Sequence, residues 1–142
     1  MTPTLAAELI QRVAADAVAA GSLRCGLAFA DEIGDPGERY DEWIRVSVVG
    51  LDPRTPTHGA RGGRVVQQRG ALFVQAFVSR SISDGAGRSR ALCQAARDLY
   101  QGTTINNSDP ITFGAANVAP VPGPDPWSMH SASIPFTYLE TL

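Results

Sequence analysis

The run from Val65 to Ser79 restricts the possible folds of this chain more than any other segment. Fully extended, it would span roughly 45 Å. Apolar side chains of its second half point to both faces, with Leu72, Val74, Ala76 and Val78 on one and Phe73 and Phe77 on the other. A strand that is apolar on both faces is covered on both sides. The run therefore predicts a central strand, which we expect Gly70 to bend or bulge.

Two amphipathic helices are predicted, one before this strand and one after it. The first begins with Thr2 as a hydroxyl cap and Pro3 at the first helical position, and Gly21 ends it. Its predicted apolar stripe is Leu5, Leu9, Val13 and Ala17, with Ile10 beside them. The second spans Arg88 to Tyr100, with the stripe Leu92, Ala95, Ala96 and Leu99. Each helix has one apolar stripe, so each packs on something.

Four further strands complete the prediction: Leu23 to Phe29, Trp43 to Val49, Ile111 to Val118 and Ser128 to Tyr138. A proline-rich connection joins the last two as an open hairpin, and Pro135 places the last strand at an edge or beside an irregularity. The predicted fold is a single α/β (α+β) domain over residues 1–142, with a mixed or antiparallel five-stranded sheet. Two helices cover one face, in the order α-β-β-β-α-β-β. A neighbouring copy is the expected cover for the other face.

Two long connections carry opposite charges. Residues 30–41 form an acidic loop that includes Asp31, Asp35 and Glu38. Residues 51–64 form a long Gly/Pro loop, and from 54 to 69 the chain carries Arg54, Arg61, Arg64 and Arg69 without an acid. The formal net charge of -2 calls for neither nucleic acid nor an anionic membrane. In a ring of identical subunits we expect the acidic loop of one subunit to face the basic loop of the next. Such exposed ion pairs guide the encounter and alignment of the subunits more than they stabilise the ring.

Patterns for catalysis or metal binding are missing from the sequence. The only histidines are His58 and His130, no nucleophile-elbow sequence is present, and the acidic loop lacks EF-hand spacing. The two cysteines, Cys25 and Cys93, have no metal-binding spacing and are expected to be reduced and buried. Neither a secretory signal nor an apolar run near 18 residues is present, so we expect a cytoplasmic chain when made.

The glycine-rich stretch from Ile82 to Leu92 raises the question of a nucleotide site. A Walker A loop needs a lysine, and the chain has none. In the dinucleotide fingerprint the third glycine would fall at the position of Arg90, after Gly85 and Gly87. We expect a strand-to-helix corner capped by Ser83 or Asp84. A small phosphate- or nucleotide-binding enzyme, with Arg88 and Arg90 at the helix start, is the alternative from a different class.

Several short motifs occur together in a familiar order. They are an N-terminal amphipathic helix, Trp-Ile-Arg-Val-Ser-Val (Trp43 to Val48), Arg-Gly-x-Leu-x-Val-Gln-x-Phe (Arg69 to Phe77), Gly-x-Gly-Arg-Ser-Arg-Ala-Leu (Gly85 to Leu92), Ile-Thr-Phe-Gly (Ile111 to Gly114), a tryptophan, and Ile-Pro-Phe-Thr-Tyr (Ile134 to Tyr138). In this combination the chain resembles the tail terminator (tail completion, or minor tail) proteins of long-tailed bacteriophages and related prophage elements. The resemblance runs from about Leu5 to Tyr138 and does not include the two charged loops.

The resemblance implies a structural protein of the virion, at the junction of tail and neck, assembled in the host cytoplasm. Such proteins form a ring, typically a hexamer, that caps the head-proximal end of the tail tube and stops its polymerisation. The implied partners are further copies of the chain, the tail tube protein and a head-completion or connector protein, while DNA only passes through the ring. No catalytic residue, metal, cofactor or membrane is implied. Another head–tail connector of the neck is the alternative within the same class.

The two charged loops, the second apolar face of the central strand and the arginines at the start of the second helix give one set of candidate residues for contact with another subunit or with the tail tube. These residues are Arg54, Arg61, Arg64, Arg69, Asp31, Asp35, Glu38, Phe73, Phe77, Arg88 and Arg90.

Overall fold

The computed structural model describes residues 2–29, 40–50, 65–105, 109–123 and 126–141. Its elements follow in the order α1 (Pro3–Ala19), β1 (Gly26–Phe29), β2 (Glu42–Gly50), β3 (Val65–Ser79), α2 (Gly85–Asp98), β4 (Thr104–Ile105), β5 (Ile111–Phe113), β6 (Asn117–Val121) and β7 (Trp127–Thr141). The strands form one seven-stranded mixed sheet in the order β1-β2-β3-β7-β5-β4, with β6 paired to β7. The mixed α+β domain with two helices is confirmed, whereas the five-strand count and order are wrong.

Strands β3 and β7 form the long centre of the sheet. They are antiparallel and stay in register from the pair Val65 and Thr141 to the pair Ser79 and Trp127. The predicted bulge at Gly70 is wrong, since β3 stays paired residue for residue there and Gly70 lies opposite both Gly50 and Phe136. The Phe136 ring fills the place that a Cβ on Gly70 would take. Glycine is therefore needed for space in the core and not for a bulge.

On the other side of β7, the predicted strand from Ile111 to Val118 is two strands. Strand β5 pairs with β7 at Phe136 and Thr137, and β6 pairs with it from Met129 to Ser133. Pro135 lies between these stretches, and its carbonyl accepts a hydrogen bond of 2.8 Å from the Gly114 N–H. In an antiparallel strand the N–H and C=O of one residue point to the same side. Because proline has no N–H, the ladder on that side is interrupted, which confirms the predicted irregularity.

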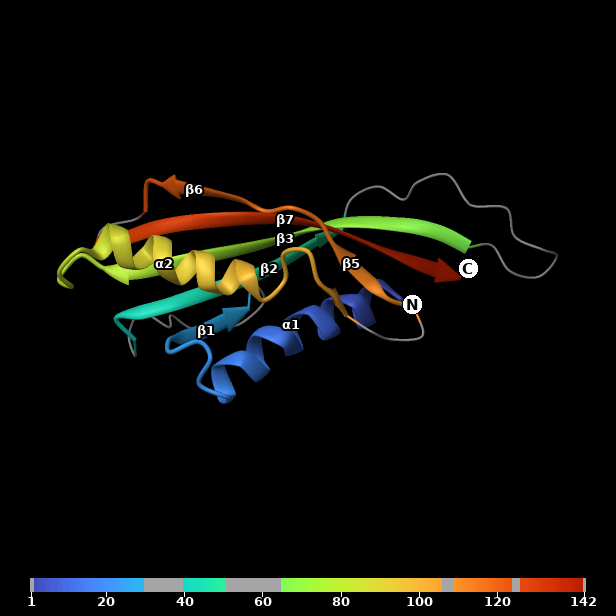
Figure 1. Cartoon of the computed structure of the whole chain (residues 1–142), viewed down its shortest axis with the longest axis horizontal. Helices are drawn as coiled ribbons and strands as arrows, with labels where there is room; N and C mark the ends of the chain where they lie inside the picture. Colours follow the sequence, from blue (N-terminus) through green and yellow to red (C-terminus); the bar gives the residue numbers. More distant parts are fainter. Residues whose placement is uncertain (1, 30–39, 51–64, 106–108, 124–125, 142) are drawn as a thin grey trace.

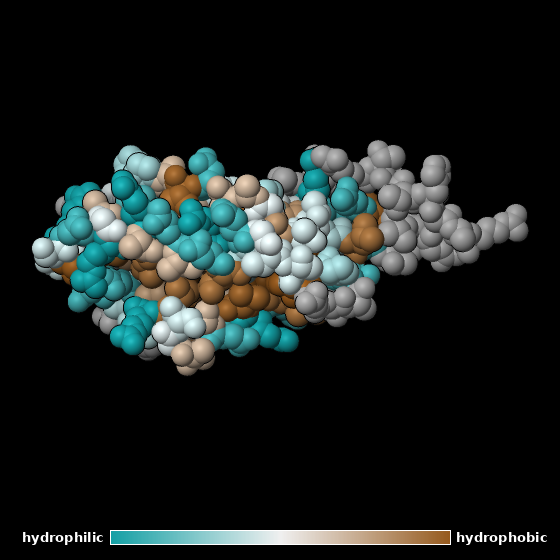
Figure 2. All heavy atoms as spheres, in the orientation of Figure 1, coloured by the Kyte–Doolittle hydropathy of each residue, from teal (hydrophilic) through white to brown (hydrophobic). Residues whose placement is uncertain are grey.

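Both helices pack on the same face of the sheet and share one hydrophobic core with it. Helix α1 lies beside β1 and β2, and α2 lies across β3 and β7 (Figure 1). The Tyr100 hydroxyl, just after α2, donates a hydrogen bond of 2.7 Å to the Ile10 carbonyl and so ties the two helices together. Between the two helices, away from this bond, Figure 2 shows a band of hydrophobic surface, and the outer surfaces of the helices are more hydrophilic. No helix within the described ranges is long and apolar enough to cross a membrane.

Helix α1 begins and ends as its sequence predicts. The Thr2 hydroxyl accepts a hydrogen bond from the Leu5 N–H, and Gly21 takes the left-handed conformation at φ 80°. Its buried stripe is different from the predicted one and consists of Ala6, Ile10, Ala14 and Ala17. Alanines bring the helix axis close to the sheet, which turns Leu5 outward to 37% exposure. The larger Leu9 and Val13 pack half-buried beside the stripe.

The opposite side of β2, β3 and β7 carries no helix within the described chain, and we call it the helix-free face. Alternation along the strands assigns the residues to it. Val48, Leu72 and Ile134 point into the helix-covered core, so their neighbours along each strand point to the helix-free face. This face is where the predicted contact with another copy would lie.

Candidate functional site

The glycine-rich corner before α2 holds a carboxylate where a phosphate would have to bind. Asp84 is the residue before the helix and has a left-handed backbone at φ 56°. A Cβ on Gly87 would collide with the Asp84 carboxylate, so this carboxylate lies against the first turn of α2. A negative charge there complements the helix dipole and would repel a bound anion. The geometry therefore favours the structural corner over the phosphate-binding turn.

Arg88, in the first turn of α2, has its ionic partner in its own chain. Its guanidinium lies 2.6 Å from the Glu42 carboxylate at the start of β2. An ion pair this exposed contributes about 0–1 kcal/mol, but it leaves Arg88 no need of an acid from a neighbour. Arg90 is exposed and makes no ion pair with the described part of the chain. Of the two candidate arginines at this corner, only Arg90 has its charge available.

A serine and a histidine meet beneath α2. The Ser89 hydroxyl lies 2.6 Å from His130 Nδ1 and 3.0 Å from the Ala86 carbonyl, and both side chains are buried. In a catalytic triad a carboxylate orients the second ring nitrogen. Here His130 Nε2 is buried without a hydrogen-bond partner among the described residues. The pair joins α2 to β7 and offers a substrate no access, so it serves packing.

An aromatic cluster closes one end of the helix-free face. The Trp43 and Phe77 rings are stacked with centroids 4.0 Å apart, and Trp127 packs edge-on against Trp43 at 6.0 Å. The Arg45 guanidinium lies over both stacked rings, at 5.3 and 5.8 Å from their centroids. Trp43 and Phe77 are thereby buried. Phe77, a predicted contact residue, is covered by its own chain and stabilises the pairing of β2 with β3.

The other end of the helix-free face is open. Val49 is opposite Ala71, and Ala71 is opposite Pro135, so the three form an apolar row across β2, β3 and β7. Val49 is 45% exposed, and Leu139, farther along β7, is 43% exposed. Sequence analysis missed both residues, although the alternation of each strand places them on this face. We call this region, together with the predicted contact residues Arg69 and Phe73, the open apolar end.

Six of the predicted contact residues lie outside the described residues. They are Arg54, Arg61 and Arg64 of the basic loop and Asp31, Asp35 and Glu38 of the acidic loop. The expected pairing of the two loops between subunits therefore stays a prediction.

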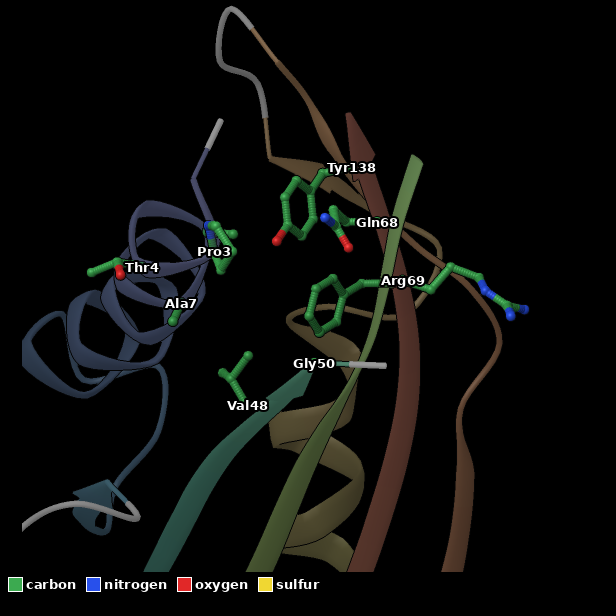
Figure 3. Close-up of a pocket in the computed structure, with 10 residues that line it drawn as sticks. Pro3, Thr4, Ala7, Val48, Gly50, Gln68, Arg69 and Tyr138 are labelled. Carbon is green, nitrogen blue, oxygen red and sulfur yellow. The ribbon is translucent and has the colours of Figure 1, made fainter. Parts of the chain in front are cut away.

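A cavity of about 440 Å³ lies between the start of α1 and the sheet (Figure 3). Pro3 and Ala7 of α1 form one wall, and Val48 and Tyr138 belong to the opposite one. Gln68 at its edge donates a hydrogen bond of 2.6 Å to the Glu140 carboxylate. The side chain of Arg69 points away from the cavity, toward the helix-free face (Figure 3). The described walls are mostly apolar and none of their residues turns a cation inward, so they suit an apolar group better than a phosphate.

Neither cysteine forms a disulfide, and Cys93 is buried as predicted while Cys25 is half-buried. Burial raises the pKa of both thiols to about 11. At neutral pH they are therefore protonated and poor nucleophiles. Within the described residues no three His, Cys, Asp or Glu side chains are grouped so as to hold a metal ion.

Comparison with known proteins identifies a fold and no family. No protein-family model matches the chain. Among curated proteins there is no match either. In solved structures, 11 chains match. One of them, whose name states no function, has a TM-score of 0.62 at 13% sequence identity, over 92% of this chain and 94% of that one. At this identity the likeness is one of fold over the whole domain.

Proposed function

We propose that this protein is a structural tail terminator, which forms a ring on the head-proximal end of a bacteriophage tail tube. The ring stops polymerisation of the tube and provides the surface for head–tail joining. One observation carries the proposal: within the described chain the sheet has helices on one face only, while the other face ends in an open apolar row. A soluble domain buries such a row against a partner.

The motifs behind the family resemblance lie on elements that build this architecture. Trp43 to Val48 is within β2, and Arg69 to Phe77 is the part of β3 that runs along the helix-free face. Gly85 to Leu92 is the first half of α2, and Ile134 to Tyr138 lies in β7 opposite β3. These segments come together around the same sheet, so the resemblance and the exposed face support one proposal.

Binding work, and not catalysis, is what the described side chains support. The serine–histidine pair is buried, the thiols are protonated, and a carboxylate lies against the glycine-rich corner. A thermal-shift titration with ATP, NAD and inorganic phosphate is expected to leave the melting temperature unchanged. A ligand at a hundred times its dissociation constant would stabilise the fold by about 2.7 kcal/mol and would favour the nucleotide-binding alternative.

The proposal is tested by the mass of the assembled protein and by its effect on tube growth. Native mass spectrometry is expected to show a closed oligomer. Six copies are expected from the resemblance to tail terminators. Added to polymerising tail tube protein, the full chain is expected to shorten the tubes and to appear at one end of each in negative-stain images. Binding to a head connector without any binding to tube ends would instead favour a connector of the neck. A mass of one chain at micromolar concentration would refute the ring.

A further inference from the structure

Arg69 is a cation on the helix-free face without a partner among the described residues. It is half-buried, lies opposite Thr137 of β7, and points away from the cavity on the helix side (Figure 3). Its Nε is buried, and within the described ranges the side chain has neither a hydrogen-bond partner for this nitrogen nor an ion pair. A partly buried guanidinium is costly unless an acceptor satisfies it. A carboxylate, which can receive two N–H bonds from arginine, would complete this site.

The surroundings of Arg69 are apolar. Leu139 lies two residues beyond Thr137 on the same side of β7, and the row of Val49, Ala71 and Pro135 crosses the neighbouring positions. Single exposed apolar side chains are ordinary on protein surfaces, but a contiguous row beside an unpaired charge marks a contact surface. The partner that fits it presents one carboxylate next to one large apolar side chain.

The outward surface of α1 presents that combination. Leu5 is 37% exposed, and Glu8, one turn later, is also exposed. Residues three apart lie side by side on a helix. Glu8 forms no ion pair with any described residue, so its charge is as available as that of Arg69. The helix layer and the helix-free face are on opposite sides of the domain, so one copy cannot bring the two together.

We infer that the outward surface of α1 in one copy docks on the open apolar end of the next. Glu8 then pairs with Arg69, and Leu5 packs against Val49 and Leu139. The inference rests on the proposed ring and deepens it by naming the two surfaces that meet. The contact joins different surfaces of identical chains, which is the arrangement that closes into rings. It also places a helix on the uncovered side of the sheet.

A charge exchange between the two residues tests the inference in the full-length protein. Arg69→Glu and Glu8→Arg, each alone, place like charges together and are expected to raise the concentration needed for assembly at least tenfold. The double variant restores an opposite-charge pair and is expected to assemble at close to the wild-type concentration. Arg24→Glu, which reverses an exposed arginine outside both proposed surfaces and outside the candidate set, is the matched control and is expected to leave assembly unchanged. Native mass over a concentration series measures all four, and far-ultraviolet circular dichroism checks their folding.

The outcomes separate this inference from the proposed function. Rings formed by both single variants at the wild-type concentration would overturn the Glu8–Arg69 contact while leaving the ring itself intact. A folded double variant that stays as dissociated as its parents would overturn the contact in the same way. A single-chain mass for the wild type would overturn the ring and, with it, this interface. Loss of assembly in Leu5→Ser and Val49→Ser, with folding retained, would support the apolar half of the contact.

Discussion

Replacing His130 by Asn is expected to remove a specific loss of stability at acidic pH. The His130 side chain is 4% exposed, and its Nε2 has no partner in the described part of the chain. Burial, and then the positive charge of Arg90, lower the pKa of this imidazole below its ordinary value. Whichever tautomer the contact with Ser89 selects, the protonated ring would carry an Nε2–H without an acceptor. The folded protein therefore keeps His130 neutral at pH values where the unfolded chain binds a proton.

The difference in proton binding between the folded and unfolded states gives the sign and size of the stability loss at acidic pH. Below the unfolded pKa of about 6.5 the unfolded state holds more protons, so the free energy of unfolding falls as pH falls, by at most about 1.4 kcal/mol per pH unit. The loss stops once the pH passes below the folded pKa. Between the unfolded pKa and pH 5, this slope limits the cost to the wild type to at most about 2 kcal/mol. Asn is polar but does not titrate, so this part of the pH dependence disappears.

Urea unfolding from pH 8 down to pH 5 measures the difference. The stability gap between wild type and His130→Asn is expected to narrow as the pH is lowered. Ser89→Ala is the matched control, because it removes the hydroxyl contact and keeps the buried imidazole, and it is expected to retain the wild-type slope. If wild type and His130→Asn lose stability in parallel, His130 does not stay neutral in the fold and the reasoning fails.

Three further substitutions test the packing, each by urea denaturation. Gly70→Ala is expected to destabilise the fold by about 1–3 kcal/mol, because the new Cβ meets the Phe136 ring. Gly50→Ala, directly opposite with open space around it, is its control, and equal losses for the two would contradict this reason. Phe77→Ala is expected to cost about 3–5 kcal/mol because its stacked ring is buried; a loss typical of a surface site would mean that the aromatic cluster is open. Tyr100→Phe is expected to cost about 0.5–1.5 kcal/mol through its bond to the first helix, and an unchanged midpoint would show that this bond is not formed in solution.

Helices and strands were predictable where the spacing of apolar residues within one segment indicates the element. The alternation of β2 and of β3 and the capping of α1 depend on neighbours in sequence, and these elements begin and end within a few residues of the prediction. The division between β5 and β6 depends on Pro135, which lies about twenty residues later in the chain and beside the break only after the strands have paired. The stripe of α1 was misjudged because leucines dominate the pattern, while the alanines allow the close approach to the sheet.

The candidate surface was predictable in outline and not in detail. The sequence predicts two helices, enough to cover one face of the sheet, and a central strand that is apolar on both faces. This indicated that the second face needs a partner, and Arg69 and Phe73 lie on that face. Phe77 was indistinguishable from Phe73 by sequence, because its burial depends on being opposite Trp43 in the neighbouring strand. The pairing of Arg88 with Glu42 likewise joins residues 46 positions apart. Contacts of this kind depend on which residues lie opposite each other in paired strands, and the local sequence pattern does not determine that.

The charge on the helix-free face favours one of two ways in which another copy could cover it. Two copies related by a twofold axis could pack their uncovered faces together, but the same surface would then meet itself, and the two Arg69 side chains would approach within an apolar contact. Like charges in such a place oppose association. The aromatic cluster around Trp43 is already closed by Arg45 and Trp127, so among the described residues the open apolar end is the part of this face left to bind. A contact limited to that end, made with a surface that carries Glu8, favours head-to-tail assembly. A stable species of two chains whose mass is insensitive to Glu8→Arg would contradict this choice and favour the twofold arrangement.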